Sequence, residues 1–287
     1  MSAVVTMSAL PPRRRSWTLV VGLVLTAAVV VVALVSLVWL PFEPSDTTGT
    51  RLEGPNAEHW LGTDKLGRDL ATQLMIGARI ALAVGLGSVA VGAVIGITVG
   101  LVAAFAASWL DDTISAALDV VIAFPVLLLA MLIVAAQGAS LGSVILAIGL
   151  AMSAIVARLT RVLAKRVLSM QYVTAAQTSG TRWPGIVVRH ILPNIWPTLS
   201  VNLALQFGVA VLAEASLSYL GLGAPPPNAS WGRLLQEAQG TVVTAPVGAI
   251  APGLALIALV IGVNFIADGL RDVADPSRRT SRKRNSR

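Results

Sequence analysis

The sequence predicts an all-α polytopic membrane protein with six transmembrane helices. Hydrophobic residues make up 55% of the 287 residues and charged residues only 12%, which is about half the charged share of a soluble domain. Six apolar segments reach the length of about 20 residues that a helix needs to cross a bilayer. Lys and Arg then fall mainly on one side of the membrane. The predicted spans are 17–40, 74–107, 114–136, 141–163, 196–222 and 247–270.

The first apolar segment, 17–40, follows Arg13-Arg14-Arg15 and therefore resembles a signal peptide. Its run of about 24 apolar residues is longer than the core of a signal peptide, and no cleavage site of small residues precedes Pro41. We predict a retained transmembrane helix. Residues 1–16 then form a cytoplasmic N-terminal segment, and 41–73 form an extracytoplasmic loop.

The second segment, 74–107, is long enough to tilt or to project beyond the bilayer. It carries Ser88, Gly92, Gly96 and Gly100 at intervals of four residues. Small residues at this spacing let two helix backbones approach closely within a membrane. We therefore predict that this stripe packs against another span.

The third and fourth segments, 114–136 and 141–163, are separated only by the short turn 137–140. This spacing predicts a tight helical hairpin. The segments 196–222 and 247–270 complete a core transmembrane domain that covers residues 74–271.

The distribution of basic residues orients the chain. Of the 21 lysines and arginines, 16 fall on the side that holds both termini, and 5 fall on the other side. Cytoplasmic loops carry this kind of excess, so both termini are predicted to be cytoplasmic. The net charge of +7 then reflects basic cytoplasmic ends rather than nucleic-acid binding. The basic tail, 272–287, is expected to lie near anionic lipid.

The sequence offers little for catalysis. It contains no cysteine, so disulfides and thiolate metal sites are excluded. None of the three lysines is followed by Ser or Thr, as a phosphate-binding loop requires. His59 and His190 fall on opposite sides of the predicted membrane. We therefore predict that the chain is not an enzyme and holds neither a cofactor nor a metal.

Three acidic residues lie within or beside the predicted spans, where ionisable groups are costly and often functional. Asp119 lies in the inner half of the third span and suits either a structural role or the lining of a path. Glu214 lies deeper, in the fifth span, and suits a cavity-facing role or a hydrogen bond between helices equally well. Asp268, close to Arg271, is best explained as a charge at the membrane interface.

The region 164–195 is a polar, basic island between apolar spans. We expect a first short helix over 164–178, ended by Gly180, because Gly accepts the left-handed conformation at a helix end. A second helix over 183–191 is followed by Pro193 and Pro197. The small residues Ala175 and Ala176 suit docking in a groove, and an amphipathic helix on the membrane surface explains the pattern equally well.

The arrangement of Ala175-Ala176, Gly180 and Ile191-Leu192-Pro193 resembles the cytoplasmic "EAA" loop of permease subunits in bacterial ABC importers. Further segments are similar to the C-type permease of dipeptide and oligopeptide systems. They are His59-Trp60-Leu61-Gly62-Thr63-Asp64 with Gly67-Arg68-Asp69, 214–223 with 230–232, and 268–272 with Asp275-Pro276. The resemblance covers roughly residues 13–276. The chain departs from the family pattern at Thr174, where the family usually has Glu.

The resemblance implies the transmembrane fold of a type I ABC importer in the inner membrane of a bacterial cell. It implies a peptide transport role, in which this chain forms half of a translocation path. A homologous second permease subunit would complete a heterodimer, two ABC ATPase subunits would bind ATP and Mg, and an extracytoplasmic substrate-binding protein would deliver the peptide. The coupling loop 164–195 would dock on the ATPases through Tyr172, Ala175, Ala176, Gly180 and Arg182, and Glu214 and Asp119 would face the path.

Two alternatives remain at the level of the sequence. One is a stand-alone proton-coupled carrier that uses Glu214 and Asp119. The sequence shows no internal repeat symmetry of the kind that such carriers have. The other is the same fold with nickel or glutathione as its cargo.

Overall fold

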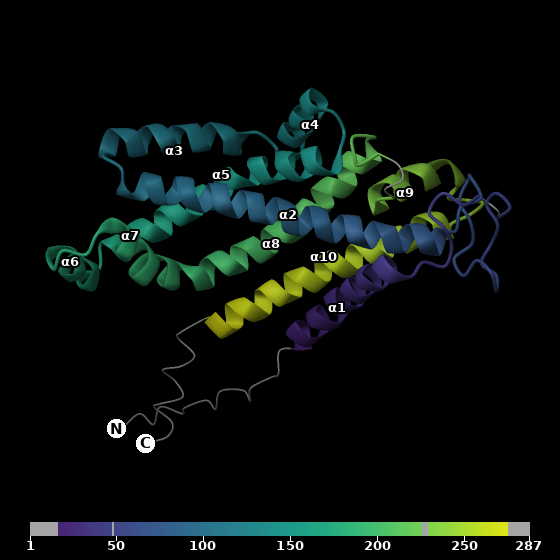
Figure 1. The fold of residues 1–287 in the computed structure, drawn as a ribbon, viewed down its shortest axis with the longest axis horizontal. Coiled ribbons are helices and arrows are strands. Elements are labelled where there is room, and N and C mark those ends of the chain that lie inside the picture. The colour runs from purple at the N-terminus through teal and green to yellow at the C-terminus, as the bar shows by residue number, and fades with distance from the viewer. Residues whose placement is uncertain (1–16, 48, 226–228, 275–287) are drawn as a thin grey trace, which may run out of the picture.

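The structure, a computed structural model, describes residues 17–47, 49–225 and 229–274 as a helical bundle (Figure 1). The predicted N-terminal segment 1–16 and most of the predicted basic tail lie outside the described residues. The helices are α1 Trp17–Val38, α2 Leu70–Phe105, α3 Ser108–Ala123, α4 Val126–Gln137, α5 Leu141–Leu168, α6 Gln171–Thr178, α7 Trp183–Ile186, α8 Leu192–Tyr219, α9 Trp231–Ala238 and α10 Val247–Ala274, with a π-helix at Val187–Ile191 and a short 3₁₀ turn at Gln239–Thr241.

Five of these helices are long and apolar enough to cross a membrane, and the pair α3 and α4 brings the number to six if it counts as one span. The long helices lie side by side along the long axis of the molecule (Figure 1). We call the end formed by α6 and α7 the inner end. The end formed by residues 41–69 and α9 is the outer end. These names follow the sides that the charge distribution predicts.

The third predicted span is not the single helix 114–136. It is broken into α3 and α4, whose axes differ by 90°. Pro125 has no backbone N–H to continue the helix, and the residue before a proline is driven to an extended conformation. Phe124 has φ −80° and ψ 132°, in agreement with that effect. The hairpin predicted for the third and fourth spans is formed by α4 and α5.

The predicted glycine stripe of α2 is confirmed as a packing face. The most extensive helix pair in the structure is α2 with α5. A Cβ atom added at Gly96 would lie 2.6 Å from Val156 Cβ, and one added at Gly100 would lie 2.5 Å from the Ala157 carbonyl oxygen. Only hydrogen at these positions allows the two backbones to lie so close.

The short helices differ from the prediction at their boundaries. α5 runs on to Leu168, and the chain turns at Ser169 and Met170 before α6 begins. The helix predicted over 164–178 is therefore two helices. α2 begins at Leu70, earlier than predicted, because the Thr72 backbone N–H donates to the Asp69 carboxylate at 2.7 Å and caps the helix.

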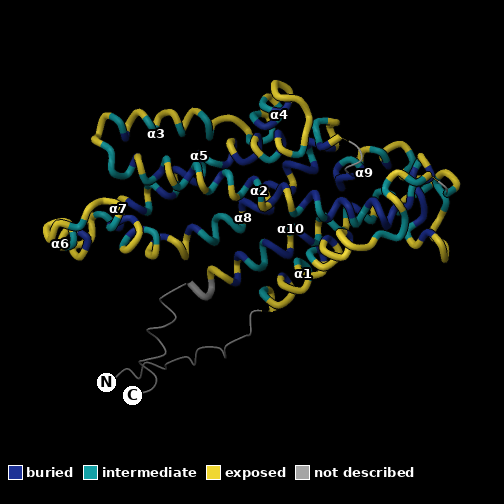
Figure 2. Tube along the Cα trace, viewed as in Figure 1, coloured by how far each residue is buried: buried dark blue, intermediate teal, exposed yellow. Residues whose placement is uncertain are grey.

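The peripheral helices leave much of their surface uncovered (Figure 2). α1 packs on α10, where Gly22 and Gly262 bring the backbones together. The opposite face of α1 exposes Val24, Val31 and Leu34. Exposed aliphatic side chains on a span of this hydropathy suit contact with lipid. The core lies where α2, α5 and α8 meet.

Candidate functional site

The inner end carries a short lever made of α6, α7 and the π-helix. Val173 is the buried residue of α6 and joins an apolar cluster with Ile186, Ile191 and Leu199. Tyr172 and Ala175 are exposed, and Ala176 is partly exposed. One face of α6 is thus held by the bundle, and the face with the predicted docking residues is free.

Gly180 ends α6 with a Schellman motif. The Thr181 N–H donates to the Ala176 carbonyl, and the Gly180 N–H donates to the Gln177 carbonyl, both at 3.0 Å. Gly180 has φ +86°, which side chains with a Cβ rarely adopt, and the space around it is open. The predicted role of Gly180 as a helix stop is confirmed, and its requirement is conformational rather than steric.

Tyr172 is tied back to the start of α8. Its ring lies 5.9 Å from that of His190, and the Asn194 side-chain amide donates to the Tyr172 hydroxyl at 3.2 Å. The same amide donates to the His190 carbonyl at 2.6 Å. The sequence reading did not identify His190 and Asn194 as partners of Tyr172. The only sequence signal for this contact was that His190 and Asn194 lie in the polar island.

The lever continues into the fifth span without a loop. The π-helix Val187–Ile191 connects α7 to α8, and Pro197 lies inside α8. Single turns of π-helix are frequent at functional sites. Residues 179–182 form the turn that joins α6 to α7 at the start of this connection. Arg182 is exposed at the N-terminal cap of α7, on the same end of the molecule.

A buried ion cluster joins α3 to α5 at the inner end. Asp111 receives hydrogen bonds from Arg161 Nε at 2.5 Å and Nη2 at 2.7 Å, and it also contacts the Lys165 ammonium. Asp111 is the buried residue of α3. The sequence reading missed this acid, because its partners lie 50 and 54 residues away.

A second ion pair lies further along the same two helices. Asp119 Oδ1 lies 3.2 Å from Arg158 Nη1, and the two side chains are 60% and 59% exposed. Asp119 thus pairs with a basic residue of the same chain, and more than half of its side chain remains exposed.

Glu214 is buried, with 2% of its surface exposed. The Ser218 hydroxyl donates to its carboxylate at 2.6 Å, one turn further along α8. Ser230, at the cap of α9, is also buried nearby and hydrogen bonds to the same carboxylate. Of the two roles open for Glu214, this arrangement favours the hydrogen bond between helices.

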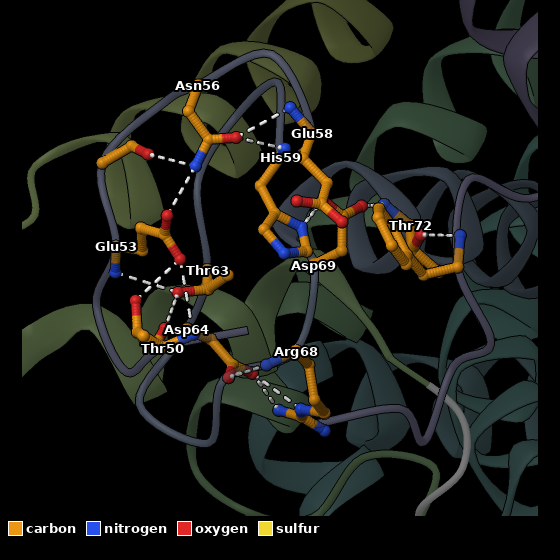
Figure 3. A network of polar contacts seen from close by, with 12 residues as sticks. Thr50, Glu53, Asn56, Glu58, His59, Thr63, Asp64, Arg68, Asp69 and Thr72 are labelled. Atoms are coloured by element: carbon orange, nitrogen blue, oxygen red, sulfur yellow. Dashed lines mark hydrogen bonds and ion pairs between the residues drawn. The ribbon is translucent and has the colours of Figure 1, made fainter. Parts of the chain in front are cut away.

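The outer end is an ordered polar network (Figure 3). Arg68 connects this network to α9. Buried His59 contacts the Asp69 carboxylate at 3.1 Å, and Asp69 caps α2. Arg68 lies between Asp64 at 2.6 Å and Glu237 of α9 at 2.9 Å. The predicted loop therefore has a fixed shape. The motif residues His59, Asp64, Arg68 and Asp69 maintain it.

Within this network the Thr50 hydroxyl donates to Glu53 at 2.7 Å. This hydrogen bond is the largest of the effects that lower the pKa of the Glu53 carboxyl from its ordinary value. The described residues contain no group of three or more His, Asp or Glu that could hold a metal ion.

The long apolar helices make the chain a multi-pass membrane protein. The chain matches the family described as "Binding-protein-dependent transport system inner membrane component" over residues 96–280. It belongs to this family of ABC importer permeases and is a multi-pass component of the inner membrane.

Curated relatives are similar over most of their length. The dipeptide transport system permease protein DppC of Alkalihalophilus pseudofirmus is 38% identical over 90% of this chain and 85% of the relative. The glutathione transport system permease protein GsiD of Pectobacterium atrosepticum is 41% identical over 78% of this chain and 74% of the relative.

A solved structure supports the fold. An inward-facing structure of the MetNI methionine ABC transporter superposes with a TM-score of 0.60 at 20% identity, covering 71% of this chain and 96% of that chain. The predicted resemblance to ABC importer permeases and the predicted helical membrane fold are both confirmed.

Proposed function

We propose that this chain is a permease subunit of an ATP-driven importer of peptides. The observation that carries the proposal is its 38% identity to a dipeptide transport permease over 90% of the chain. The chain would form half of the translocation path. A homologous second permease would supply the other half, and an extracytoplasmic binding protein would deliver the peptide.

The free energy of ATP hydrolysis would be coupled to transport at the inner end. We infer that the exposed face of α6, with Tyr172, Ala175 and Ala176, docks on ABC ATPase subunits that bind ATP and Mg. Arg182 would contribute a charge at the same surface. Two features support this role: α6 is anchored by Val173, and α7 runs through the π-helix into α8 without a loop. Rigid-body closure of the ATPases would then move a span directly.

The test is reconstitution of the complex. With the second permease, the ATPases and the binding protein, proteoliposomes should import dipeptide only when ATP is supplied. This chain alone should import nothing and hydrolyse no ATP. Import driven by a pH gradient without ATP, or by this chain alone, would overturn the proposal in favour of a proton-coupled carrier.

Glutathione is the second candidate cargo, because a relative named for its transport is 41% identical to this chain. Competition decides between the two: an excess of unlabelled glutathione should leave dipeptide uptake unchanged in a dipeptide importer. Strong inhibition by glutathione, together with uptake of labelled glutathione, would reassign the cargo.

A further inference from the structure

The ion pair of Asp119 and Arg158 lies within the spans but is open on one side. Both side chains are about 60% exposed. Asp111, on the same helix, is only 6% exposed between its two cations. The chain therefore covers one ion cluster of the α3–α5 contact and leaves the other uncovered.

The position of the pair along the helices places it in the inner half of the predicted spans. Asp119 follows Asp111 by eight residues on α3, and Arg158 precedes Lys165 by seven on α5. At about 1.5 Å per residue, both helices place the pair about 10–12 Å from the inner cluster. Half of the hydrocarbon core measures about 15 Å.

Such a pair cannot lie against lipid without a large cost, so it faces water or another polar surface. The contact with Asp119 engages one terminal nitrogen of Arg158. A guanidinium has five N–H donors. A dry protein interface would have to satisfy the remaining donors, whereas a water-filled path satisfies them with water or with solute.

We propose that Asp119 and Arg158 face the aqueous translocation path and form a binding site for the charged ends of a zwitterionic solute. The inference rests on the proposed function as a peptide importer and assigns a role to Arg158 that the sequence reading did not. Arg158 binds the carboxylate of the solute, and Asp119 binds its ammonium group.

The chemistry of the pair suits a peptide with free ends. A guanidinium binds a carboxylate through two parallel hydrogen bonds. The pair neutralises itself when the path is empty, and the solute replaces each partner by a group of equal charge. Binding then exchanges one ion pair for two others, so the net gain in free energy is small. A site that must release its solute requires such weak binding. A metal cation would match Asp119 alone and be repelled by Arg158.

The absence of cysteine from the chain makes single-cysteine variants a direct test. Asp119→Cys and Arg158→Cys are placed separately in the complete complex in nanodiscs, with cysteine-free partner subunits and without binding protein. Each is labelled with an anionic thiosulfonate, methanethiosulfonate ethylsulfonate, and with a cationic one, the ethyltrimethylammonium reagent. Val31→Cys on the uncovered face of α1, where the side chain is 55% exposed, is the lipid-facing control.

Both variants should react with the hydrophilic reagents, and Val31→Cys should not. Asp119→Cys leaves Arg158 alone and should favour the anionic reagent. Arg158→Cys leaves Asp119 alone and should favour the cationic one. Dialanine at ten times its dissociation constant should slow the labelling of Asp119→Cys about elevenfold, and its C-terminal amide should protect far less.

The inference is overturned if neither variant reacts with a hydrophilic reagent while N-ethylmaleimide modifies both, since the pair then faces lipid or a closed interface. Equal protection by dialanine and its amide would also overturn it. Uptake by the unmodified complex is measured separately. Import of dialanine without protection at Asp119→Cys removes this inference alone, and absence of ATP-driven peptide import removes the proposed function.

Discussion

At the scale of single residues, Gly180 has a backbone conformation that suits glycine, and it lies beside the surface that we propose docks on the ATPases. Its φ of +86° is required by the Schellman motif that ends α6. Gly221 provides a matched case at the end of α8. It has φ +81° and open space around it, and its neighbours make the same pair of hydrogen bonds, from Leu222 to Leu217 and from Gly221 to Ser218.

Replacing Gly180 by Ala should destabilise the end of α6 by about 1 kcal/mol, because a Cβ disfavours positive φ. The α6 surface would lose its fixed position, and transport per ATP hydrolysed should fall while membrane insertion stays normal. The ratio of dipeptide uptake to ATP hydrolysis in proteoliposomes measures this.

Gly221→Ala is the control, since it introduces the same strain away from the inner end. We expect it to lower the thermal stability by a similar amount and to leave the ratio of uptake to hydrolysis near that of the unmodified complex. Equal loss of coupling in both variants would show that the Gly180 effect is general instability.

At the scale of elements, α3 is attached to the bundle mainly by charge. Its buried residue is Asp111, held by Arg161 and Lys165 near the end of α5. α5 leads through a short turn into α6. The cluster therefore connects α3 to the helix that leads into α6, as the π-helix connects α7 to α8.

Asp111→Asn should destabilise the subunit by about 2 kcal/mol, because the charge-assisted hydrogen bonds from Arg161 and the contact with Lys165 are lost while both cations remain partly exposed. α3 should detach from α5, and the apparent unfolding temperature of the purified complex should fall. Asp112→Asn is the control, because Asp112 is the exposed neighbour. An unchanged unfolding temperature for Asp111→Asn would refute the attachment by charge.

The spans could be predicted from the sequence because length and hydropathy are local properties. The break between α3 and α4 was not predicted although Pro125 is present in the sequence. Hydropathy averaged over an apolar segment is little affected by a single residue. The second short helix predicted over 183–191 corresponds to α7 and the π-helix, but the turn at Ser169 and Met170 was missed. The clusters around Asp111 and Arg68 join residues that are far apart in sequence, and one sequence does not reveal such pairs.

At the scale of the whole molecule, the two ends of the bundle are built differently. The inner end has the exposed helix α6, which the turn at 179–182 joins to α7. The outer end is a polar network joined to α9 through Arg68 and Glu237. α9 is itself fixed to the spans, because the Trp231 indole N–H donates to the Leu74 carbonyl at 3.0 Å and its ring lies against Gly77.

Arg68 thus joins the outer segment to α9 by an ion pair. Arg68→Met keeps the length of the side chain but removes the contacts with Asp64 and Glu237. We expect residues 41–69 to move more freely and a protease added from the outer side to cleave them faster. ATP hydrolysis stimulated by loaded binding protein should fall, while basal hydrolysis should not change.

Arg51→Met is the matched control, since Arg51 donates to the Lys65 carbonyl within the segment and not to α9. It should alter the protease pattern much less and leave the stimulation intact. If Arg68→Met is stimulated normally while cleavage is accelerated, the anchored outer segment serves stability alone. Loss of stimulation specific to Arg68→Met would connect the shape of the outer end with events at the inner end.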